Sequence, residues 1–318
     1  MTGAVIGLHH VTAVSKNITG NVDFYTRILG LRLVKKTVNF DQPSHYHLYF
    51  GDERGRPGSV LTLFLHTDLQ SGRIGGGQAT ITSFAVPPDA LPFWRRRLRQ
   101  TAARHVIDET LSDEKRSVFQ DPDGLLFALV ETEDERVPWL TSNIGSDVAI
   151  RGLHGVTLAQ QSTARMPEIL VDVLGYEQVN VERIGNGHHL RFALPGTKAA
   201  SIIDVQIDAN IARGTDGTGT VHHIAFGVED EATQASLRKQ LREVGLQVSD
   251  QRDRTYFKSI YARSPAGILL EIATAGPGFE FDEPFEKLGT SLCLPEHLEA
   301  RRQEIEALLP PIPTVNDA

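Results

Sequence analysis

Two pairs of adjacent histidines and one carboxylate, all in apolar strand-like sequences, are the residues best suited to bind a metal ion. The pairs are His9–His10 in GLHHVT and His222–His223 in VHHIAF, and the carboxylate is Glu271 in GILLEIAT. A lone carboxylate in an apolar strand is costly to bury unless it is paired or metal-bound. One imidazole from each pair and Glu271 would form a 2-His-1-carboxylate set, which leaves coordination positions open and suits non-haem Fe(II).

Strand alternation divides each pair of histidines between two faces. Alternate residues of a strand face the same side, so His10 shares a face with Thr12, and His223 shares one with Ala225. The first histidine of each pair then lies on the opposite face. A purely structural role therefore stays open for His9 and His222.

The elements that must position these residues occur in an internal repeat. GLHHVTAVS at 7–15 matches GLHGVTLAQ at 152–160, and SVFQDPDGLLFALVET matches SIYARSPAGILLEIAT. Each half also divides in two, because 81–100 and 222–245 both predict a strand followed by an amphipathic helix. The sequence thus predicts an α+β chain of four strand–helix–strands modules, which start near residues 7, 79, 152 and 220.

The repeat also predicts domain bounds. The first pair of modules spans 7–140, the second pair spans 150–276, and 277–318 forms a capping tail. The glycine-rich stretch RIGGGQAT is expected to be a linker rather than a phosphate-binding loop, because no helix follows it.

Comparison of the two halves provides an internal control for the metal ligands. Alignment places Gly155 opposite His10, Ser83 opposite His223 and Ala128 opposite Glu271. One set of positions therefore keeps three ligands and the other keeps none. Because the ligands come from modules one and four, we expect these two modules to share one cleft.

A chain of four βαβββ modules in two similar halves resembles the vicinal oxygen chelate (VOC) superfamily, which includes glyoxalase I, extradiol dioxygenases and bleomycin-resistance proteins. This resemblance implies two open β-barrel-like domains with a divalent metal on a concave face. It selects His10 over His9 and His223 over His222, because in the family the ligand directly precedes the aliphatic residue. It also allows a homo-oligomer.

Longer motifs are similar to those of the bacterial hydroquinone ring-cleaving dioxygenases. They are HHVTAVSKNITGNVDFYTRILGLRLVKKTVNFD, YHLYFGDERGRPGSVLTLF and the tail motif GFEFDEP. The resemblance implies an Fe(II)-dependent (or Mn(II)-dependent) enzyme acting on a dihydroxylated aromatic and O₂. It carries onto Thr12, Arg254 and Tyr261 near the substrate, and onto His9 and His222 beside the ligands.

Two other functions remain as alternatives. A glyoxalase-type isomerase or lyase would need a further glutamate at the end of module one, where Thr62 stands. A metal-free protein that sequesters an aromatic compound or drug would not need the retained triad. Turnover without O₂ would favour the first alternative, and ligand binding by metal-free protein would favour the second.

Other candidate residues are assigned structural roles. His45 and His47 are co-facial and His66 lies nearby, but they are expected to be rim or structural residues because no nearby carboxylate completes a set. Asp121 and Asp123 in QDPDG are explained by turn chemistry. Cys293 is expected to be an inert thiol.

Bulk properties restrict the partners and the compartment. The 318 residues carry a formal net charge of −8, which disfavours nucleic acid and acidic membranes. A single cysteine fits a reducing cytosol, and no signal peptide or membrane span is evident. We expect a cytoplasmic protein.

Overall fold

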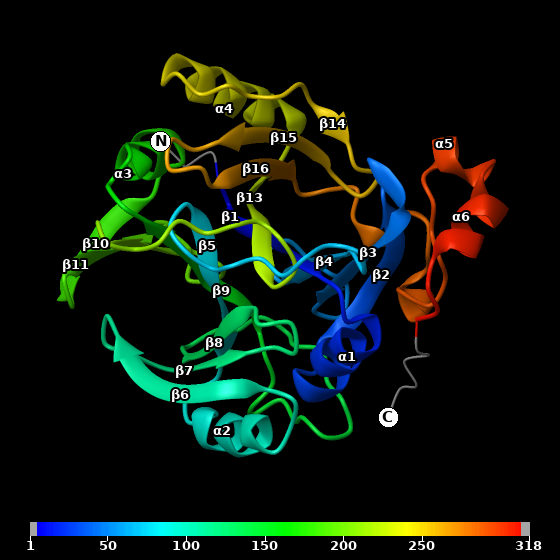
Figure 1. Cartoon of the computed structure of the whole chain (residues 1–318), viewed down its shortest axis with the longest axis horizontal. Coiled ribbons are helices and arrows are strands. Elements are labelled where there is room, and N and C mark those ends of the chain that lie inside the picture. The colour runs from blue at the N-terminus through cyan, green and yellow to red at the C-terminus, as the bar shows by residue number, and fades with distance from the viewer. Residues whose placement is uncertain (1–4, 313–318) are drawn as a thin grey trace.

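The computed structural model describes residues 5–312, which form two eight-stranded sheets, each curled into an open half-barrel (Figure 1). In spatial order the first sheet contains β14 (Arg252–Asp253), β15 (Lys258–Arg263), β16 (Leu269–Thr274), β13 (Thr220–Val228), β1 (Gly7–Ser15), β4 (Val60–Leu65), β3 (Gln42–Gly51) and β2 (Arg32–Asn39). The second contains β10 (Glu177–Ile184), β11 (Gly187–Ala193), β12 (Ile202–Ile207), β9 (Gly152–Gln160), β5 (Gln78–Val86), β8 (Leu126–Glu131), β7 (Glu114–Gln120) and β6 (Arg104–Leu111). The predicted α+β fold is confirmed.

Each half-barrel combines modules from both halves of the chain. β1 pairs antiparallel with β13 and parallel with β4, so modules one and four share a sheet, which agrees with the prediction that they share one cleft. β9 pairs in the same way with β5 and β12, which joins modules two and three. The bounds 7–140 and 150–276 therefore describe the sequence repeat, and each of these segments contributes strands to both sheets.

Helices flank the sheets at the places predicted from the sequence. In modules two and four they are α2 (Leu91–Arg99) and α4 (Glu231–Glu243). In modules one and three a short α-helix continues as a π-helix: α1 (Ile18–Asp23) with η1 (Phe24–Ile28), and α3 (Met166–Glu168) with η2 (Ile169–Val173). Their buried faces, exemplified by Trp94 and Leu237, pack against the apolar side of the sheets in one continuous core.

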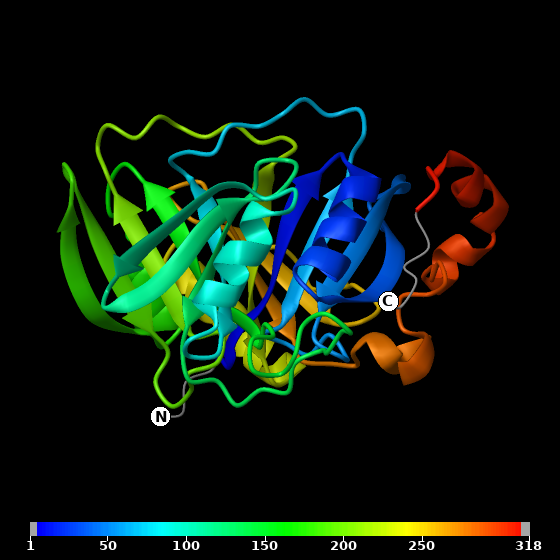
Figure 2. The same ribbon diagram turned by 90° about the horizontal axis from the view of Figure 1, so that it is seen from below.

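The C-terminal tail packs along edge strand β2 (Figure 2). It contains η3 (Phe279–Phe281), η4 (Phe285–Lys287), α5 (Glu296–Glu299) and α6 (Arg302–Leu308), and its residues 313–318 lie outside the described residues. The fully buried Lys35 Nζ lies 2.5 Å from Asp282 Oδ1 and 2.6 Å from Glu283 Oε2. Cys293 N donates to the Lys36 carbonyl at 2.9 Å, so the tail covers this edge of the sheet.

Two long loops connect the half-barrels at one end of the molecule (Figure 2). Residues 66–77 and 208–219 run side by side, and Gly76 N donates to the Ala212 carbonyl at 2.8 Å. A Cβ atom on Gly75 would lie 2.3 Å from that carbonyl oxygen, so the glycines permit close backbone approach. RIGGGQAT is thus a linker that leads into β5, as predicted.

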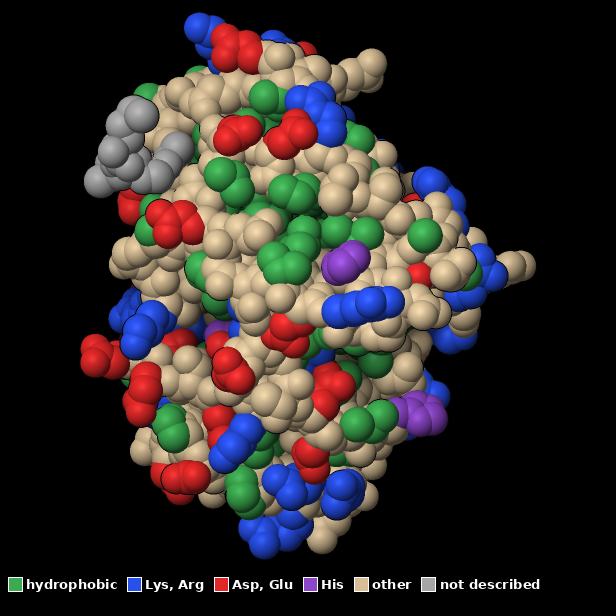
Figure 3. Space-filling model, turned by 90° about the vertical axis from the view of Figure 1, so that its left-hand side faces the viewer, with side chains coloured by type: hydrophobic (Ala, Val, Ile, Leu, Met, Phe, Trp, Pro, Cys, Tyr) green, Lys and Arg blue, Asp and Glu red, His purple; other side chains and the backbone are tan. Residues whose placement is uncertain are grey.

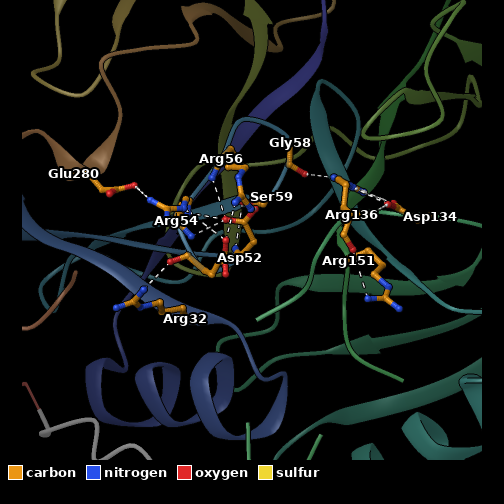
Figure 4. A network of polar contacts seen from close by, with 12 residues as sticks. Arg32, Asp52, Arg54, Arg56, Gly58, Ser59, Asp134, Arg136, Arg151 and Glu280 are labelled. Atoms are coloured by element: carbon orange, nitrogen blue, oxygen red, sulfur yellow. Dashed lines mark hydrogen bonds and ion pairs between the residues drawn. The ribbon is translucent and has the colours of Figure 1, made fainter. Parts of the chain in front are cut away.

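A polar network holds the starts of β4 and β9 together (Figure 4). Asp52 Oδ1 accepts from the three backbone amides of 54–56, which fixes the turn before β4. Arg136 donates to the carbonyls of Gly58 and Leu153, at 2.7 Å each, and is oriented by Asp134. The guanidinium therefore links module one to module three.

The surface carries charges of both signs. On the side where β10 and β11 lie in Figure 1, acidic and basic side chains are interspersed (Figure 3). Within residues 5–312, no helix has the length and apolar character needed to cross a membrane.

Candidate metal centre

His10, His223 and Glu271 converge on the concave face of the first half-barrel. They come from β1, β13 and β16, which are adjacent in the sheet (Figure 1). His10 Nε2 lies 3.3 Å from His223 Nε2 and 3.5 Å from Glu271 Oε2, and the latter lies 2.8 Å from His223 Nε2. The three side chains predicted as ligands are therefore brought together, with one donor atom each directed at a common point.

The three side chains are buried, with 2%, 5% and 1% exposure for His10, His223 and Glu271. Burial lowers the pKa of His223, which favours the neutral imidazole that a metal requires. Ser259 Oγ donates to Glu271 Oε1, whereas Oε2 has no hydrogen bond despite its contact with His223. The orphaned oxygen and the two imidazole nitrogens fit a divalent cation.

β-Bulges explain the adjacent histidines. The pairing of β1 with β13 shifts between Leu8 and His10, so His9 lies at a bulge, and a second shift leaves His222 without a pairing partner. The strict alternation of side chains between the two faces of a strand is therefore interrupted at His9 and at His222. His9 Nδ1 contacts His10 Nδ1 at 2.9 Å, and His222 Nδ1 contacts His223 Nδ1 at 2.7 Å.

If His10 and His223 bind a metal, these contacts also determine their tautomers. If Nε2 of His10 and His223 keeps its lone pair for a metal, Nδ1 carries the proton and donates to the neighbouring histidine. Burial lowers the pKa of His9 and that of His222 to about 3, which keeps both as neutral acceptors. His9 and His222 are thus placed to orient His10 and His223, and His222 still reaches solvent although the protein desolvates much of its ring.

A chain of hydrogen-bonding groups runs along the concave face beside the triad. Thr12 Oγ1 lies 2.8 Å from Thr62 Oγ1, which lies 2.8 Å from His47 Nε2, and His47 Nδ1 lies 2.9 Å from the Tyr49 hydroxyl. Burial lowers the pKa of His47 well below its ordinary value, and His10 reinforces this effect. Thr62 is in register with Thr12 and supplies no carboxylate.

Arg254 and Tyr261 lie at the opening of the same face. Arg254 Nε donates to the Tyr261 hydroxyl at 3.2 Å, and Arg254 Nη2 lies 3.1 Å from Asp41. Burial raises the pKa of Tyr261, so its phenol stays protonated at neutral pH. The Tyr261 ring lies 5.9 Å from the ring of His223, so both residues predicted from the resemblance adjoin the triad.

Strand pairing corrects one position of the internal alignment. His10 pairs with Ala225 and Gly155 pairs with Ser83, so Ser83 corresponds to Ala225. Ile81 is the residue that corresponds to His223, because it pairs with Thr157 as His223 pairs with Thr12. The sequence alignment was two residues out of register there, but the position still holds no ligand.

Several residues at this site were not predicted from the sequence. They are Ser259 against Glu271, Tyr49 at the end of the hydrogen-bonded chain, and Phe257, whose ring lies 5.0 Å from His9 and 5.2 Å from His10. His47 was predicted only as a rim or structural residue. The co-facial spacing of His45, His47 and Tyr49 was the signal available in the sequence.

Three residues outside the site can be compared with their predicted roles. Cys293 is buried, and burial raises the pKa of its thiol to about 12, consistent with an inert group. Asp121 accepts from two amides of its own turn and also from the Tyr25 hydroxyl at 2.6 Å. Asp123 accepts from the Lys16 and Asn17 amides, so these carboxylates also join modules one and two and are not explained by the turn alone.

Comparisons with known proteins agree with this geometry. The family model described as Glyoxalase/Bleomycin resistance protein/Dioxygenase superfamily matches residues 7–129 and 152–272. MhqO of Bacillus subtilis, to which ring-cleaving dioxygenase activity is attributed, is 40% identical over 312 residues, which cover 98% of each chain. The chlorohydroquinone/hydroquinone 1,2-dioxygenase of Sphingobium indicum is 35% identical over 310 residues and 95% of each chain.

Solved structures of other proteins share this fold. A Bacillus subtilis protein crystallised under the description of a dioxygenase superposes with a TM-score of 0.93 at 38% identity, covering 99% of this chain and 100% of that one. Glyoxalase I from Zea mays shares the fold, with a TM-score of 0.63 at 14% identity over 85% of this chain and 92% of that one. The chain therefore belongs to the Glyoxalase/Bleomycin resistance protein/Dioxygenase superfamily.

Proposed function

We propose that this chain is an Fe(II)-dependent dioxygenase that cleaves the ring of a hydroquinone or a related dihydroxylated aromatic. The observation that carries the proposal is the convergence of His10 Nε2, His223 Nε2 and Glu271 Oε2 within 3.5 Å on a buried concave face. Relatives of matching length that are named for ring cleavage and for hydroquinone 1,2-dioxygenation support the reaction class.

The ligand set fits Fe(II) and also accommodates Mn(II). Two neutral imidazoles and one carboxylate occupy one side of a metal and leave the other positions open. When bound, the metal would supply Lewis acidity and the electron transfer that activation of O₂ requires. Ser259 holds one carboxylate oxygen, so that the other faces the two imidazoles.

Arg254 and Tyr261 are proposed to bind the aromatic substrate. The hydroxyl that faces the metal must lose its proton, and a guanidinium stabilises the resulting phenolate. Arg254 is held by the Tyr261 hydroxyl and Asp41, so its charge stays at the opening of the face. Tyr261 accepts from Arg254 and keeps its own proton, which it can donate to a substrate or product oxygen. Phe257 and Phe64 provide apolar surface beside the ligand histidines.

Proton movement is proposed to use the neutral groups around the triad. The chain Thr12–Thr62–His47–Tyr49 contains hydroxyl and imidazole groups, each of which can accept one proton and donate another. On the opposite side, His222 links the Nδ1 atom of His223 to solvent. Thr12 and His222 therefore have proton-transfer or orienting roles, and His9 orients His10.

Oxygen uptake tests the proposal directly. The protein is purified anaerobically and loaded with Fe(II), and O₂ consumption is followed with hydroquinone, methylhydroquinone and catechol. We expect stoichiometric uptake with loss of the aromatic absorbance. An iron-loaded protein that consumes no O₂ with any of the three substrates would contradict the proposal, and turnover without O₂ would favour a glyoxalase-type isomerase.

Two variants test the ligand assignment. His10→Ala and Glu271→Ala each remove one ligand, so we expect loss of bound iron together with loss of ring cleavage. His188→Ala changes an exposed histidine on β11 and serves as a control that should keep both properties. Full iron content and full turnover in either ligand variant would show that the triad is wrongly assigned.

A further inference from the structure

A second group of two histidines and one carboxylate lies at the outer ends of β3 and β4. Donor atoms of His45, His66 and Asp68 lie within 4.8 Å of one another. His45 Nε2 is 3.3 Å from Asp68 Oδ1, and the rings of His45 and His66 are 4.1 Å apart. We propose that these three side chains form a second metal site, which binds a late first-row divalent ion such as Zn²⁺.

The site is distinct from the catalytic triad. His45 shares a strand face with His47 and lies two residues farther out, which is about 7 Å along a strand. His66 directly follows β4, where its amide donates to the Ser15 carbonyl at 2.8 Å, and Asp68 lies in the loop 66–77. In the sequence, no nearby carboxylate was evident that could complete a set with His45 and His47. In the structure Asp68 supplies a carboxylate, and it completes a set with His45 and His66 rather than with His45 and His47.

The imidazole nitrogens of His45 and His66 can offer lone pairs to a cation. His45 Nδ1 lies 3.0 Å from Ser44 Oγ, so Nδ1 can donate to that hydroxyl and leave the Nε2 lone pair facing Asp68. The buried imidazole of His66 makes no side-chain hydrogen bond within residues 5–312. An ion pair between His45 and Asp68 would account for the position of these two side chains but not for the placement of the His66 ring beside them.

Comparison with the third cluster of donor atoms in residues 5–312 strengthens the inference. Asp282, Glu283 and Cys293 also lie close together, but the Lys35 ammonium lies between the two carboxylates at hydrogen-bonding distance. That cluster already has its cation. The Asp68 carboxylate has no lysine or arginine as an ion-pair partner among the described residues, so a metal would face no competitor.

The donor types select the kind of ion. Two imidazoles and one carboxylate match the preferences of Zn²⁺ and its neighbours, whereas Mg²⁺ and Ca²⁺ prefer oxygen ligands. Asp68 is 72% exposed, so an ion at this site can enter from solvent and keep water in a fourth position.

Zn²⁺ binding by the full chain tests the inference. Equilibrium dialysis should give two ions per chain for the wild type, one for His66→Ala and one for His223→Ala. Asp68→Asn, which changes an exposed side chain and should not affect folding, should raise the Kd of the outer site at least tenfold. His45→Ala should also lose one ion, and the His188→Ala control should keep two.

The outcomes separate this site from the proposed catalytic centre. One ion that is lost in His66→Ala but kept in His223→Ala would support the outer site and contradict the triad. One ion with the reverse dependence would overturn the outer site. Wild-type stoichiometry and affinity in both His66→Ala and Asp68→Asn would also overturn it.

Discussion

Ser259 is predicted to control the metal affinity of the triad through Glu271. Its hydroxyl donates to Glu271 Oε1, and both side chains are buried, with 0% and 1% exposure. Ser259→Ala removes the donor and leaves a buried carboxylate oxygen without a partner. A hydrogen bond to a charged group contributes about 1.5–3 kcal/mol. Loss of a group that orients a ligand typically weakens metal binding about 10- to 100-fold.

These two magnitudes agree, because a tenfold change in Kd corresponds to about 1.4 kcal/mol. We therefore expect Ser259→Ala to raise the Kd for Mn(II) about 10- to 100-fold. Mn(II) is a suitable probe because it resists oxidation in air and its free form can be quantified by electron paramagnetic resonance. Oxygen uptake at saturating Fe(II) should recover much of the wild-type rate, since the three ligands remain.

A second buried serine of the same sheet region provides the control. Ser264 accepts from the Ile268 amide at 3.1 Å and does not contact Glu271. Ser264→Ala should lose a comparable hydrogen bond and some stability, but should bind Mn(II) as the wild type does. An unchanged Kd in Ser259→Ala, or equal weakening in both variants, would refute the orienting role of Ser259.

Two predictions concern stability, measured by urea unfolding. Lys35→Ala leaves Asp282 and Glu283 without their buried counter-ion and should lower the free energy of unfolding by about 3–5 kcal/mol. The neighbouring Lys36→Ala should lower it by less than about 1 kcal/mol. Equal effects of the two substitutions would contradict the role of Lys35. Burial raises the pKa of Asp121 from 3.8 to about 6, so between these pH values the folded chain holds a proton that the unfolded chain has lost. The contribution of Asp121 to the free energy of unfolding should thus fall by roughly 3 kcal/mol as pH rises through this window. Asp121→Asn should flatten the dependence of the unfolding free energy on pH. An unaltered pH dependence in this variant would contradict the assignment to Asp121.

The fold and the triad could be predicted because both leave periodic signals in the sequence. The repeat marks the four modules, and a carboxylate in the apolar sequence of β16 marks a buried charge that needs a partner. The comparison of halves also predicted that modules one and four share one cleft. It did so only because His10, His223 and Glu271 must meet, since local sequence does not reveal which modules pair.

Other features could not be predicted because they depend on contacts between distant segments. The bulges at His9 and His222 arise from the pairing of β1 with β13, and alternation within either strand places both histidines on the wrong face. β5 has the equivalent bulge at Thr80, so Ile81 corresponds to His223, and the local sequence that aligned Ser83 with His223 did not reveal this correspondence. Ser259 looks like an ordinary strand residue until the pairing of β15 with β16 brings it to Glu271.

The second half-barrel shows how a buried, inward-facing carboxylate is neutralised by a cation. Asp204 occupies the position that corresponds to Thr62, because it pairs with Thr157 as Thr62 pairs with Thr12. This buried carboxylate is neutralised by Arg191, whose Nε and Nη2 lie 2.8 and 3.0 Å from its two oxygens.

Glu271 has no such partner, since its ion-pair partners within residues 5–312 are His10 and His223. Burial lowers the pKa of His223, which favours a neutral ring that offers a lone pair rather than a positive charge. Burial of Glu271, which is 1% exposed, disfavours its charge, but the two imidazoles hold the pKa of the carboxyl well below its ordinary value. In one half-barrel a guanidinium neutralises the inward-facing carboxylate. In the other, we propose that a divalent metal bound by Glu271 Oε2 and the two imidazoles takes that role, which would couple metal binding to the stability of the first half-barrel.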